Sequence, residues 1–500
     1  MLTTLLQTPE QAARWLRERV TGSLWADSRK VGAGDGFIAW PGAATDGRKY
    51  VNQALAAGAH ACLVEQDGVD AYGFSDDRIA VYGGLKAATA PIAAAYFDEP
   101  SQHLQVLAVT GTNGKTSTTW WLAQALAKLG RRCGVVGTLG VGEPHAMVYN
   151  GLTTPDPVLL QQQLRRFVDE GFSACAMEAS SIGMAERRLD ATAIQIAILT
   201  NFTQDHLDYH ASMQVYWEAK AGLFSWPGLK AAVINVDDHK GVELAESLRE
   251  SGLDVWTFSC VGPARIEARA IEHGAQALSF EVFEGAEKHW ISTPMVGQYN
   301  VSNLLGVMAA LRAMNISLKD AVGACADLLP VPGRMETIAL QGRPLAVIDY
   351  AHTPDALEKV LSALRPVALS RGGRLWCVFG CGGDRDATKR PLMAAVAEKN
   401  ADEIVVTSDN PRSESPAVII SQILLGLSHR AVVHVQADRA AAIAHALGLA
   451  QSGDVVLIAG KGHEDYQEVQ GVRLPFSDRV HAQAALQQGP ATVPGAGGVA

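Results

Sequence analysis

The stretch LQVLAVTGTNGKTSTTWWLAQALAKLG, residues 104–130, decides the fold class. Its apolar start predicts a buried strand over residues 104–109, and the helical periodicity of residues 118–129 predicts a helix that ends at Gly130. Between them, the glycine-rich turn GTNGKTS brings backbone N–H groups and the positive end of the helix to one point. A strand, such a turn and a helix in this order are typical of a phosphate-binding loop.

This loop predicts a nucleotide site. We expect Lys115 to reach the β- and γ-phosphates of ATP and the Thr116 hydroxyl to bind Mg²⁺. The spacing departs from the full phosphate-loop motif, because Val109 stands where the first glycine is expected. The predicted ATP-binding residues of the loop are Gly111, Thr112, Asn113, Gly114, Lys115, Thr116 and Ser117.

Outward from this loop, strand-like and helix-like segments alternate. Buried strands are predicted at residues 133–138, 173–179, 193–200, 230–236 and 254–259, with helical segments between several of them. This alternation predicts a mostly parallel sheet that helices cover on both faces. Residues 264–295 show a period near two, which suggests an antiparallel appendage, and a helix is expected to begin near Val301.

Changes in the pattern of predicted strands and helices divide the chain into three α/β domains. We predict a small N-terminal domain at 1–98, a central phosphate-loop domain with a parallel sheet at 99–331, and a Rossmann-like, doubly wound C-terminal domain at 332–488. The second boundary lies at the segment PVPG, which cannot continue a helix. The last residues, 489–500, are too poor in bulky apolar side chains to order themselves and predict a flexible tail.

Charge and hydropathy exclude several classes of protein. The 500 residues hold 52 acidic and 42 basic side chains, a net charge of −10, which argues against a nucleic-acid binder. No apolar run is long enough to span a bilayer, and no basic segment precedes the apolar start, so we expect a soluble, cytoplasmic protein without membrane insertion. Seven scattered cysteines show no metal-binding spacing and are expected to be reduced thiols.

Two side chains are candidate metal ligands beside the nucleotide. Glu178 ends one predicted strand and His206 follows another, so the sheet brings both towards the phosphate loop. His206 and His210 also have the i,i+4 spacing of a zinc pair, but no HExxH motif surrounds them. We therefore prefer magnesium to zinc.

The C-terminal domain presents a second glycine-rich loop, residues 379–386. With Glu403 downstream, it resembles a dinucleotide fingerprint, although the third glycine is missing. A loop that offers Arg385 to an anion fits better. Arg412 and Glu464 follow two further strands, so the three strand ends would share one crevice. Two guanidinium groups beside a carboxylate suit a zwitterionic amino acid.

Ten segments in order carry a resemblance to the Mur ligases: GTNGKTS, TTPDP, MEASS, TNFTQDHLDYH, GQYNVSN, PGRME, DYAHTPDAL, FGCGGDRD, DNPR and GKGHEDYQ. The resemblance runs from about Asp27 to Arg479. It implies an ATP-dependent ligase of peptidoglycan precursor synthesis that adds meso-2,6-diaminopimelate to UDP-N-acetylmuramoyl-L-alanyl-D-glutamate through an acyl phosphate. It also implies that the N-terminal domain binds the UDP end of that substrate.

The resemblance further assigns individual residues. Asn303 would lie near the adenine, with Arg334 and Asp349 contacting ATP from the interdomain side. Lys220 would carry a carbamate (N6-carboxylysine) and bind Mg²⁺ with Thr116, Glu178 and His206; Lys115, Glu178, His206 and Lys220 would be catalytic. The UDP-muramoyl dipeptide would contact Ser28, Thr153, Thr154, Ser180 and Arg188. Diaminopimelate would contact Arg385, Asp409, Asn410, Pro411, Arg412, Gly460 and Glu464.

One departure and three rival functions stay open. Glu186 stands where the family resemblance leads us to expect a glutamine, which puts a substrate contact in doubt. The rivals are a lysine-adding ligase, a folylpolyglutamate synthetase and a noncatalytic nucleotide-binding regulator. The segment DNPR argues against the first, the N-terminal segment DSR against the second, and Glu178, His206 and Lys220 against the third. We expect a monomer whose partners are its small-molecule substrates.

Overall fold

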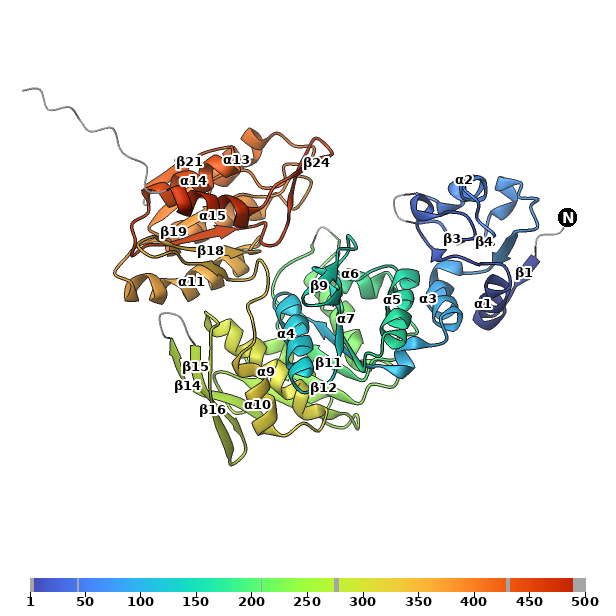
Figure 1. The fold of residues 1–500 in the computed structure, drawn as a ribbon, viewed down its shortest axis with the longest axis horizontal. Helices are drawn as coiled ribbons and strands as arrows, with labels where there is room; N and C mark the ends of the chain where they lie inside the picture. The colour runs from blue at the N-terminus through green and yellow to red at the C-terminus, as the bar shows by residue number, and fades with distance from the viewer. Residues whose placement is uncertain (1–3, 43–44, 208, 274–277, 429–431, 489–500) are drawn as a thin grey trace, which may run out of the picture.

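Three α/β domains follow one another along the chain, and the central one lies between the other two (Figure 1). The computed structural model describes residues 4–42, 45–207, 209–273, 278–428 and 432–488. The predicted flexible tail, 489–500, lies outside the described residues. The predicted fold class is confirmed, because each domain is built on its own sheet with helices packed against it.

The N-terminal domain is a five-stranded parallel sheet. Its strands, in spatial order, are β1 (Thr4–Leu6), β5 (Ile79–Tyr82), β4 (Ala61–Glu65), β3 (Gly36–Ala39) and β2 (Leu24–Trp25). Helices α1 (Pro9–Arg17) and α3 (Leu85–Tyr96) share one apolar cluster with the sheet, and α2 (Val51–Ala56) belongs to another. Val158 of the central domain is buried in the first cluster, so this face also joins the two domains.

The central domain has an eleven-stranded mixed sheet. Its parallel core is, in spatial order, β13 (Asp254–Ser259), β12 (Ala231–Asn235), β11 (Ile196–Leu199), β6 (Gln105–Thr110), β10 (Ala174–Glu178) and β7 (Cys133–Gly137). Beyond β13 lie β14 (Ile266–His273), β15 (Leu278–Glu284) and β16 (Glu287–Thr293), and beyond β7 lie β8 (Gly140–Glu143) and β9 (Ala146–Val148). The antiparallel appendage was predicted, whereas the β8–β9 hairpin was missed because its short, glycine-rich strands have no clear period.

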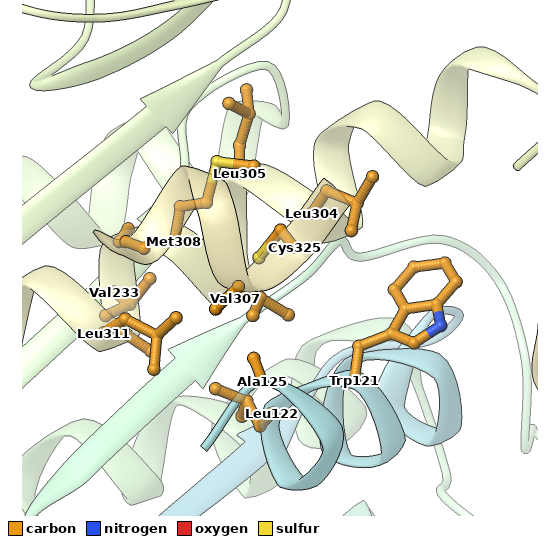
Figure 2. Close-up of a cluster of buried hydrophobic side chains, with 14 of the residues drawn as sticks. Trp121, Leu122, Ala125, Val233, Leu304, Leu305, Val307, Met308, Leu311 and Cys325 are labelled. Carbon is orange, nitrogen blue, oxygen red and sulfur yellow. The ribbon is translucent and has the colours of Figure 1, made fainter. Parts of the chain in front are cut away.

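Helices cover both faces of this sheet. They are α4 (Lys115–Lys128), α5 (Pro157–Asp169), α6 (Ser181–Ala185), α7 (Met213–Ala221), α8 (His239–Ser247), α9 (Gln298–Ala313) and α10 (Leu318–Ala326). Figure 2 shows part of the apolar cluster, in which Leu122 and Ala125 of α4 lie opposite Val307 of α9, with Trp121 to one side. This packing holds the start of α4 beside the start of α9. Helix α9 begins at Gln298, three residues before the predicted position, because Gly297 at φ 93° allows the preceding turn.

The C-terminal domain has a six-stranded sheet. In spatial order its strands are β17 (Glu336–Ile338), β18 (Leu345–Asp349), β22 (Val455–Ala459), β19 (Leu375–Phe379), β20 (Glu403–Val406) and β21 (Val432–Val435), and all but β17 are parallel. Helices α11 (Pro354–Ser370), α12 (Lys389–Asn400) and α13 (Pro416–Leu424) cover one face, and α14 (Arg439–Leu449) and α15 (Asp478–Gln488) the other. A separate hairpin, β23 (Tyr466–Val469) and β24 (Val472–Pro475), follows β22.

All seven cysteines have free thiols, and six of them are buried. Among the described helices, none combines the length and apolar character needed to cross a bilayer.

Candidate functional site

Two adjoining cavities lie where the central and C-terminal domains meet. The larger has a volume of about 1170 Å³ and the smaller about 610 Å³. Thr138, Thr153, His206, Tyr350 and His352 line both, so the cavities share a wall. The smaller is bordered by the phosphate loop and the larger by strand-end loops of the C-terminal domain. The carboxyl ends of parallel strands therefore form this site, as is usual in open α/β sheets.

The phosphate loop has the backbone shape that its glycines permit. Gly111 has a φ of 142°, and a Cβ there would stand 1.9 Å from Thr200 Oγ1. Gly114 has a φ of 88°, and a Cβ there would stand 2.5 Å from Asn303 Oδ1. Side chains at either position would collide or force the loop open, so both glycines are required for this close approach. The predicted adenine contact Asn303 is thereby held against the loop.

Lys115 and Lys220 both donate to this loop. Lys115 Nζ donates to the carbonyl oxygens of Gly111 (2.8 Å) and Thr112 (2.9 Å), and Lys220 Nζ donates to that of Gly111 (2.7 Å). Burial lowers the pKa of both amines, and for Lys220 the positive charge of Lys115 adds to the effect. Lys220, only 1% exposed, therefore has a pKa well below that of an ordinary lysine. Its amine is biased towards the neutral, nucleophilic form.

Glu178 is a buried carboxylate at the end of β10. Thr138 donates to it twice, from the backbone N to Oε1 (2.8 Å) and from Oγ1 to Oε2 (3.1 Å). A Cβ on Gly137 would stand 2.3 Å from Oε1, so the neighbouring strand makes room for the carboxylate only because residue 137 is glycine. Glu178 is thus oriented before any ligand binds.

The four predicted magnesium ligands, Thr116, Glu178, His206 and Lys220, all line the smaller cavity. No three His, Cys, Asp or Glu side chains within the described part of the chain are grouped closely enough to hold a metal by themselves. Glu178 offers a carboxylate and Thr116 a hydroxyl, and Mg²⁺ is usually bound by one or two carboxylates together with substrate phosphates and water. His206 has a left-handed backbone (φ 53°) and its Nε2 lies 3.6 Å from Asp205 Oδ2. The oxygen donors present therefore fit the ion.

The zinc alternative gains no support from His210. That side chain is buried and its Nε2 lies 3.0 Å from Ser181 Oγ, while its ring packs against Tyr216. His210 therefore packs against its neighbours, and its i,i+4 spacing from His206 does not indicate a zinc pair.

The interdomain linker, residues 327–335 between α10 and β17, contributes Arg334 to the smaller cavity. Arg334 Nη2 lies 3.4 Å from Thr116 Oγ1, and its guanidinium stacks 4.2 Å from the centre of the Tyr350 ring. Asp349 lines the same cavity and accepts from the backbone N of Met335 (2.7 Å) and of Ala351 (2.8 Å). Both residues were predicted from the resemblance to contact ATP, and the structure places both at the cavity that the phosphate loop borders.

Four of the five residues predicted to bind the UDP-muramoyl dipeptide lie together. Thr153 Oγ1 lies 3.0 Å from Thr138 Oγ1, Thr154 Oγ1 lies 2.9 Å from Ser180 Oγ, and Arg188 donates to the Thr154 carbonyl (2.9 Å). All four line the smaller cavity.

Three predicted site residues line neither of the two cavities: Ser28, Gly111 and Pro411. Ser28 begins a short helical turn in the N-terminal domain. Lys30 in that turn is close enough to influence the carboxyl of Asp156, which follows Thr154 by two residues. The N-terminal domain therefore faces the Thr153–Thr154 segment without reaching the two cavities through Ser28.

Glu186 joins the N-terminal and central domains. Its carboxylate pairs with Lys86 of α3 (2.7 Å) and accepts from Tyr209 Oη (2.5 Å). The hydrogen bonds from these two side chains lower its pKa, so the carboxylate is charged at neutral pH. The negative charge of Glu186, which puts a contact with the anionic substrate in doubt, is thus paired with the positive charge of Lys86.

The larger cavity collects the residues predicted for diaminopimelate. Arg385, Asp409, Asn410, Arg412, Gly460 and Glu464 all line it, and so do Lys389 and Arg473. Arg412 has a left-handed backbone (φ 50°), and its Nη1 donates to the Gly383 carbonyl (2.7 Å). A Cβ on Gly383 would stand 2.0 Å from the Pro411 carbonyl oxygen. The two loops are therefore in direct backbone contact, which sets the position of the guanidinium.

Sequence reasoning missed a buried cation in this pocket. Lys461 is fully buried, and its Nζ donates to Asn410 Oδ1 (3.0 Å) and Glu464 Oε2 (3.0 Å). Asn410 Nδ2 also donates to Glu464 Oε2 (2.7 Å). One oxygen of Glu464 is thus engaged within the protein, and Oε1 is turned to Tyr350. The only sequence signal was that Lys461 stands in the segment GKGHED.

Asp355 was also missed, although it stands in the motif DYAHTPDAL. It is the second residue of α11, and its Oδ2 accepts from Asn113 Nδ2 (3.0 Å) in the phosphate loop and from Thr203 Oγ1 (3.1 Å). The C-terminal domain thus contacts the phosphate loop directly.

The dinucleotide reading is not supported at Glu403. Glu403 stands at the amino end of β20 and pairs with Arg374 (2.5 Å), whereas ligands of such sheets bind at the carboxyl ends. To contact a ribose, Glu403 would have to lie at the carboxyl end of β20, at the opposite edge of the sheet.

The comparisons with known proteins agree with this geometry. Family models match residues 109–311 (Mur ligase middle domain), 333–462 (Mur ligase, glutamate ligase domain) and 23–97 (Mur ligase family, catalytic domain). A UDP-N-acetylmuramoyl-L-alanyl-D-glutamate--2,6-diaminopimelate ligase of Acidovorax sp. (strain JS42) is 59% identical over 488 residues, which are 96% of this chain and 97% of the relative. The Pseudomonas aeruginosa protein of that name is 45% identical over 470 residues, 94% of this chain and 96% of the relative.

A solved structure of a ligase with the same name is also similar. It is 34% identical, has a TM-score of 0.63, and the match covers 93% of this chain and 94% of that one. Since family models match in all three domains and a relative is this similar over nearly the whole length, the chain belongs to the Mur ligase family.

Proposed function

We propose that this protein is an ATP-dependent ligase that joins meso-2,6-diaminopimelate to UDP-N-acetylmuramoyl-L-alanyl-D-glutamate in peptidoglycan precursor synthesis. One observation carries the proposal: a phosphate-loop cavity shares a wall with a cavity lined by Arg385, Arg412 and Glu464. The names of the two relatives reported above state a ligase of the same dipeptide precursor and 2,6-diaminopimelate.

The reaction needs an activated carboxyl group, because a carboxylate resists attack by an amine. The substrate carboxylate attacks the γ-phosphorus of ATP, the bond to the bridging oxygen breaks, and an acyl phosphate and ADP form. The amine of diaminopimelate then attacks the acyl carbon. The tetrahedral intermediate expels phosphate, the amine loses a proton, and an amide remains.

The chain's own residues account for the charge that develops in the first step. Lys115 would exchange its two loop carbonyls for phosphate oxygens, which are stronger partners for an ammonium group. The backbone N–H groups at the start of α4 face the same point. When bound, Mg²⁺ would neutralise negative charge on the phosphates. Thr116, Glu178, His206 and the modified Lys220 would hold it.

The surroundings of Lys220 support the carbamate that the family resemblance implies. A neutral amine attacks carbon dioxide, the new N–C bond forms, and one proton is released to leave a carbamate anion. Burial and the neighbouring Lys115 charge favour that neutral amine. The product would place an anion beside the positive charge of Lys115, which is a favourable charge pair.

The larger cavity would hold the amino acid by both of its charged ends. Arg385 and Arg412 provide guanidinium groups for carboxylates, and Glu464 Oε1 and Asp409 face the same space for an ammonium group. Because an acyl phosphate hydrolyses readily, the domains would have to close and exclude water before it forms. We expect the hinges near His103 and Pro330.

A panel of amine acceptors tests the function. The purified protein is incubated with Mg²⁺, ATP and the UDP-muramoyl dipeptide, together with meso-diaminopimelate, lysine or glutamate, and products are read by mass spectrometry. We expect a product with diaminopimelate and equimolar release of ADP. A product with lysine alone would identify the lysine-adding rival, and binding of ATP without acceptor-dependent turnover would identify a regulator.

We also propose a compartment and an oligomeric state for the enzyme. ATP and free thiols are typical of the cytoplasm, where we place the enzyme. We expect it to act as a monomer, which light scattering at the assay concentration would test.

A further inference from the structure

Tyr350 stands in the wall between the nucleotide and amino-acid cavities. It follows strand β18 directly and lines both spaces. One face of its ring is covered by the Arg334 guanidinium at 4.2 Å, and the His463 ring lies 5.3 Å away. The hydroxyl points to Glu464 Oε1 at 3.5 Å. One side chain thus contacts a cation of the first cavity and a carboxylate of the second.

Contacts continue beyond Tyr350 on both sides. Towards the nucleotide, Arg334 Nη2 lies 3.4 Å from Thr116 Oγ1 in the phosphate loop. Towards the amino acid, the other oxygen of Glu464 is held by Asn410 and by buried Lys461. The phosphate loop and the acceptor pocket are therefore joined by an unbroken series of side chains.

The backbone around Tyr350 is packed too closely for its parts to move separately. A Cβ on Gly333, in the interdomain linker, would stand 2.1 Å from the backbone N of His463. A Cβ on Gly462 would stand 2.7 Å from the Gly333 carbonyl oxygen and 2.8 Å from Tyr350 Cβ. A displacement of the linker that carries Arg334 must therefore displace the loop that carries Glu464.

From these contacts we propose that Tyr350 is a positioning residue that couples nucleotide binding to amino-acid binding. A nucleotide that engages Arg334 fixes the linker, and Tyr350 then sets Glu464 in the position that receives the amino acid. The inference rests on the proposed function, since it takes ATP and diaminopimelate as the two ligands. It adds a residue that acts through its neighbours and forms no bond with the reacting atoms.

The long distance of 3.5 Å from Tyr350 Oη to Glu464 Oε1 marks the contact that would tighten. An ionised acceptor makes a short hydrogen bond when its geometry is good, so a small shift of the linker changes its strength. Coupling between two sites of this kind is typically 5- to 150-fold in affinity and is equal in both directions.

The test measures diaminopimelate affinity by calorimetry, with and without a Mg²⁺ complex of a nonhydrolysable ATP analogue. In the wild-type protein we expect the analogue to tighten binding by about fivefold or more. Tyr350→Phe keeps the ring, its stacking on Arg334 and its volume but removes the hydroxyl. We expect Tyr350→Phe to bring the ratio of the diaminopimelate affinities with and without the analogue close to one. The affinity for the analogue alone should change less than about twofold.

Tyr466→Phe is the matched control, because it removes a hydroxyl from the same cavity on a ring that stacks with Arg473. It should keep the wild-type ratio, whatever it does to the affinity itself. A wild-type ratio of one, or a wild-type ratio retained in Tyr350→Phe, would overturn the inference. The product assay on the wild type separates the two proposals: a diaminopimelate product together with an unaltered ratio in Tyr350→Phe would reject the coupling alone.

Discussion

At the scale of single residues, Lys220 is the side chain whose chemistry depends most on its surroundings. It is buried beside Lys115 and donates to the Gly111 carbonyl, so as a cation it would add to positive charge next to the phosphate loop. We expect the intact protein to carry one added carbon dioxide on Lys220. Lys220→Ala should lower turnover by about 10²-fold or more, because it would remove the anion that we propose as a ligand of the magnesium ion.

Mass spectrometry of a Lys220-containing peptide and steady-state assays measure these two effects. The lowered pKa of Lys220 keeps its amine neutral at a lower pH than an exposed lysine, so the carbamate should form at neutral pH when bicarbonate is supplied. Lys128→Ala, which removes a lysine from a surface pair with Asp327, is the control and should retain wild-type activity. Full activity of Lys220→Ala, with no small carboxylate added to take the place of the carbamate, would refute the proposed role of Lys220 at the magnesium site.

Arg412 carries the second prediction at this scale. Diaminopimelate differs from lysine by one carboxylate, and a preorganised guanidinium left without its anion typically costs on the order of 10³-fold in discrimination. Arg412→Ala should lower kcat/KM for meso-diaminopimelate and narrow its preference over lysine, while the KM for ATP stays nearly constant.

Competition between the two amino acids measures that preference directly. Arg412→Lys keeps the charge but loses the fork that donates to the Gly383 carbonyl, so we expect it to recover only part of the selectivity. An unchanged selectivity ratio in Arg412→Ala would show that another residue reads the distal carboxylate.

At the scale of elements, helix α12 connects two loops that line the larger cavity. Arg390 is buried in α12, and its Nη2 donates to Glu414 Oε1 (2.8 Å) and to the Gly382 carbonyl (3.1 Å). The glycine-rich loop and the Arg412 loop are thereby held by one guanidinium. The hydrogen bonds from Arg390 lower the pKa of Glu414 to about 2.

A depressed carboxyl pKa stabilises the folded protein at pH values above the unfolded pKa, and that stability is lost as the pH falls from about 4.5 towards 2. Glu414→Gln should therefore lower the Tm at pH 7, by about 2–4 °C for each 1 kcal/mol lost. The difference from the wild type should shrink below about pH 4, because the wild-type carboxyl is then protonated as well. Calorimetry across this range measures it, and a difference that stayed constant with pH would contradict the assignment.

At the scale of the whole molecule, the ion pair between Lys86 and Glu186 joins the N-terminal domain to the central one. Both side chains are partly exposed, so the pair is worth about 0.2–1 kcal/mol. Lys86→Glu places two carboxylates together and should raise the KM for the UDP-muramoyl dipeptide several-fold, with little effect on the KM for ATP.

The charge swap Lys86→Glu with Glu186→Lys restores the pair and serves as the control. Recovery of the wild-type KM in the double variant would support a role in domain orientation, and the effect should weaken at high salt. Additive losses in the two single variants would mean that the pair does not orient the domains.

The sequence by itself determined the features that depend on short spacing. The strand, glycine turn and helix around Lys115 are local, so their periodicity and turn residues predicted the shape of the loop. The convergence of Arg385, Arg412 and Glu464 was also predictable, since the carboxyl ends of parallel strands meet at one edge of a sheet. The family resemblance supplied the further roles of Asn303 and Lys220, which no local pattern indicates.

Only the tertiary structure decided which of these groups are buried and what they contact. The low pKa of Lys220, the pairing of Lys461 with Glu464, and the contact of Asp355 with Asn113 depend on residues brought together by packing. The position of Tyr350 between the two cavities could not be predicted from the sequence either. It depends on the close contact between the interdomain linker and the loop at Gly462. Desolvation and charge pairing act through space, and a sequence records only distance along the chain.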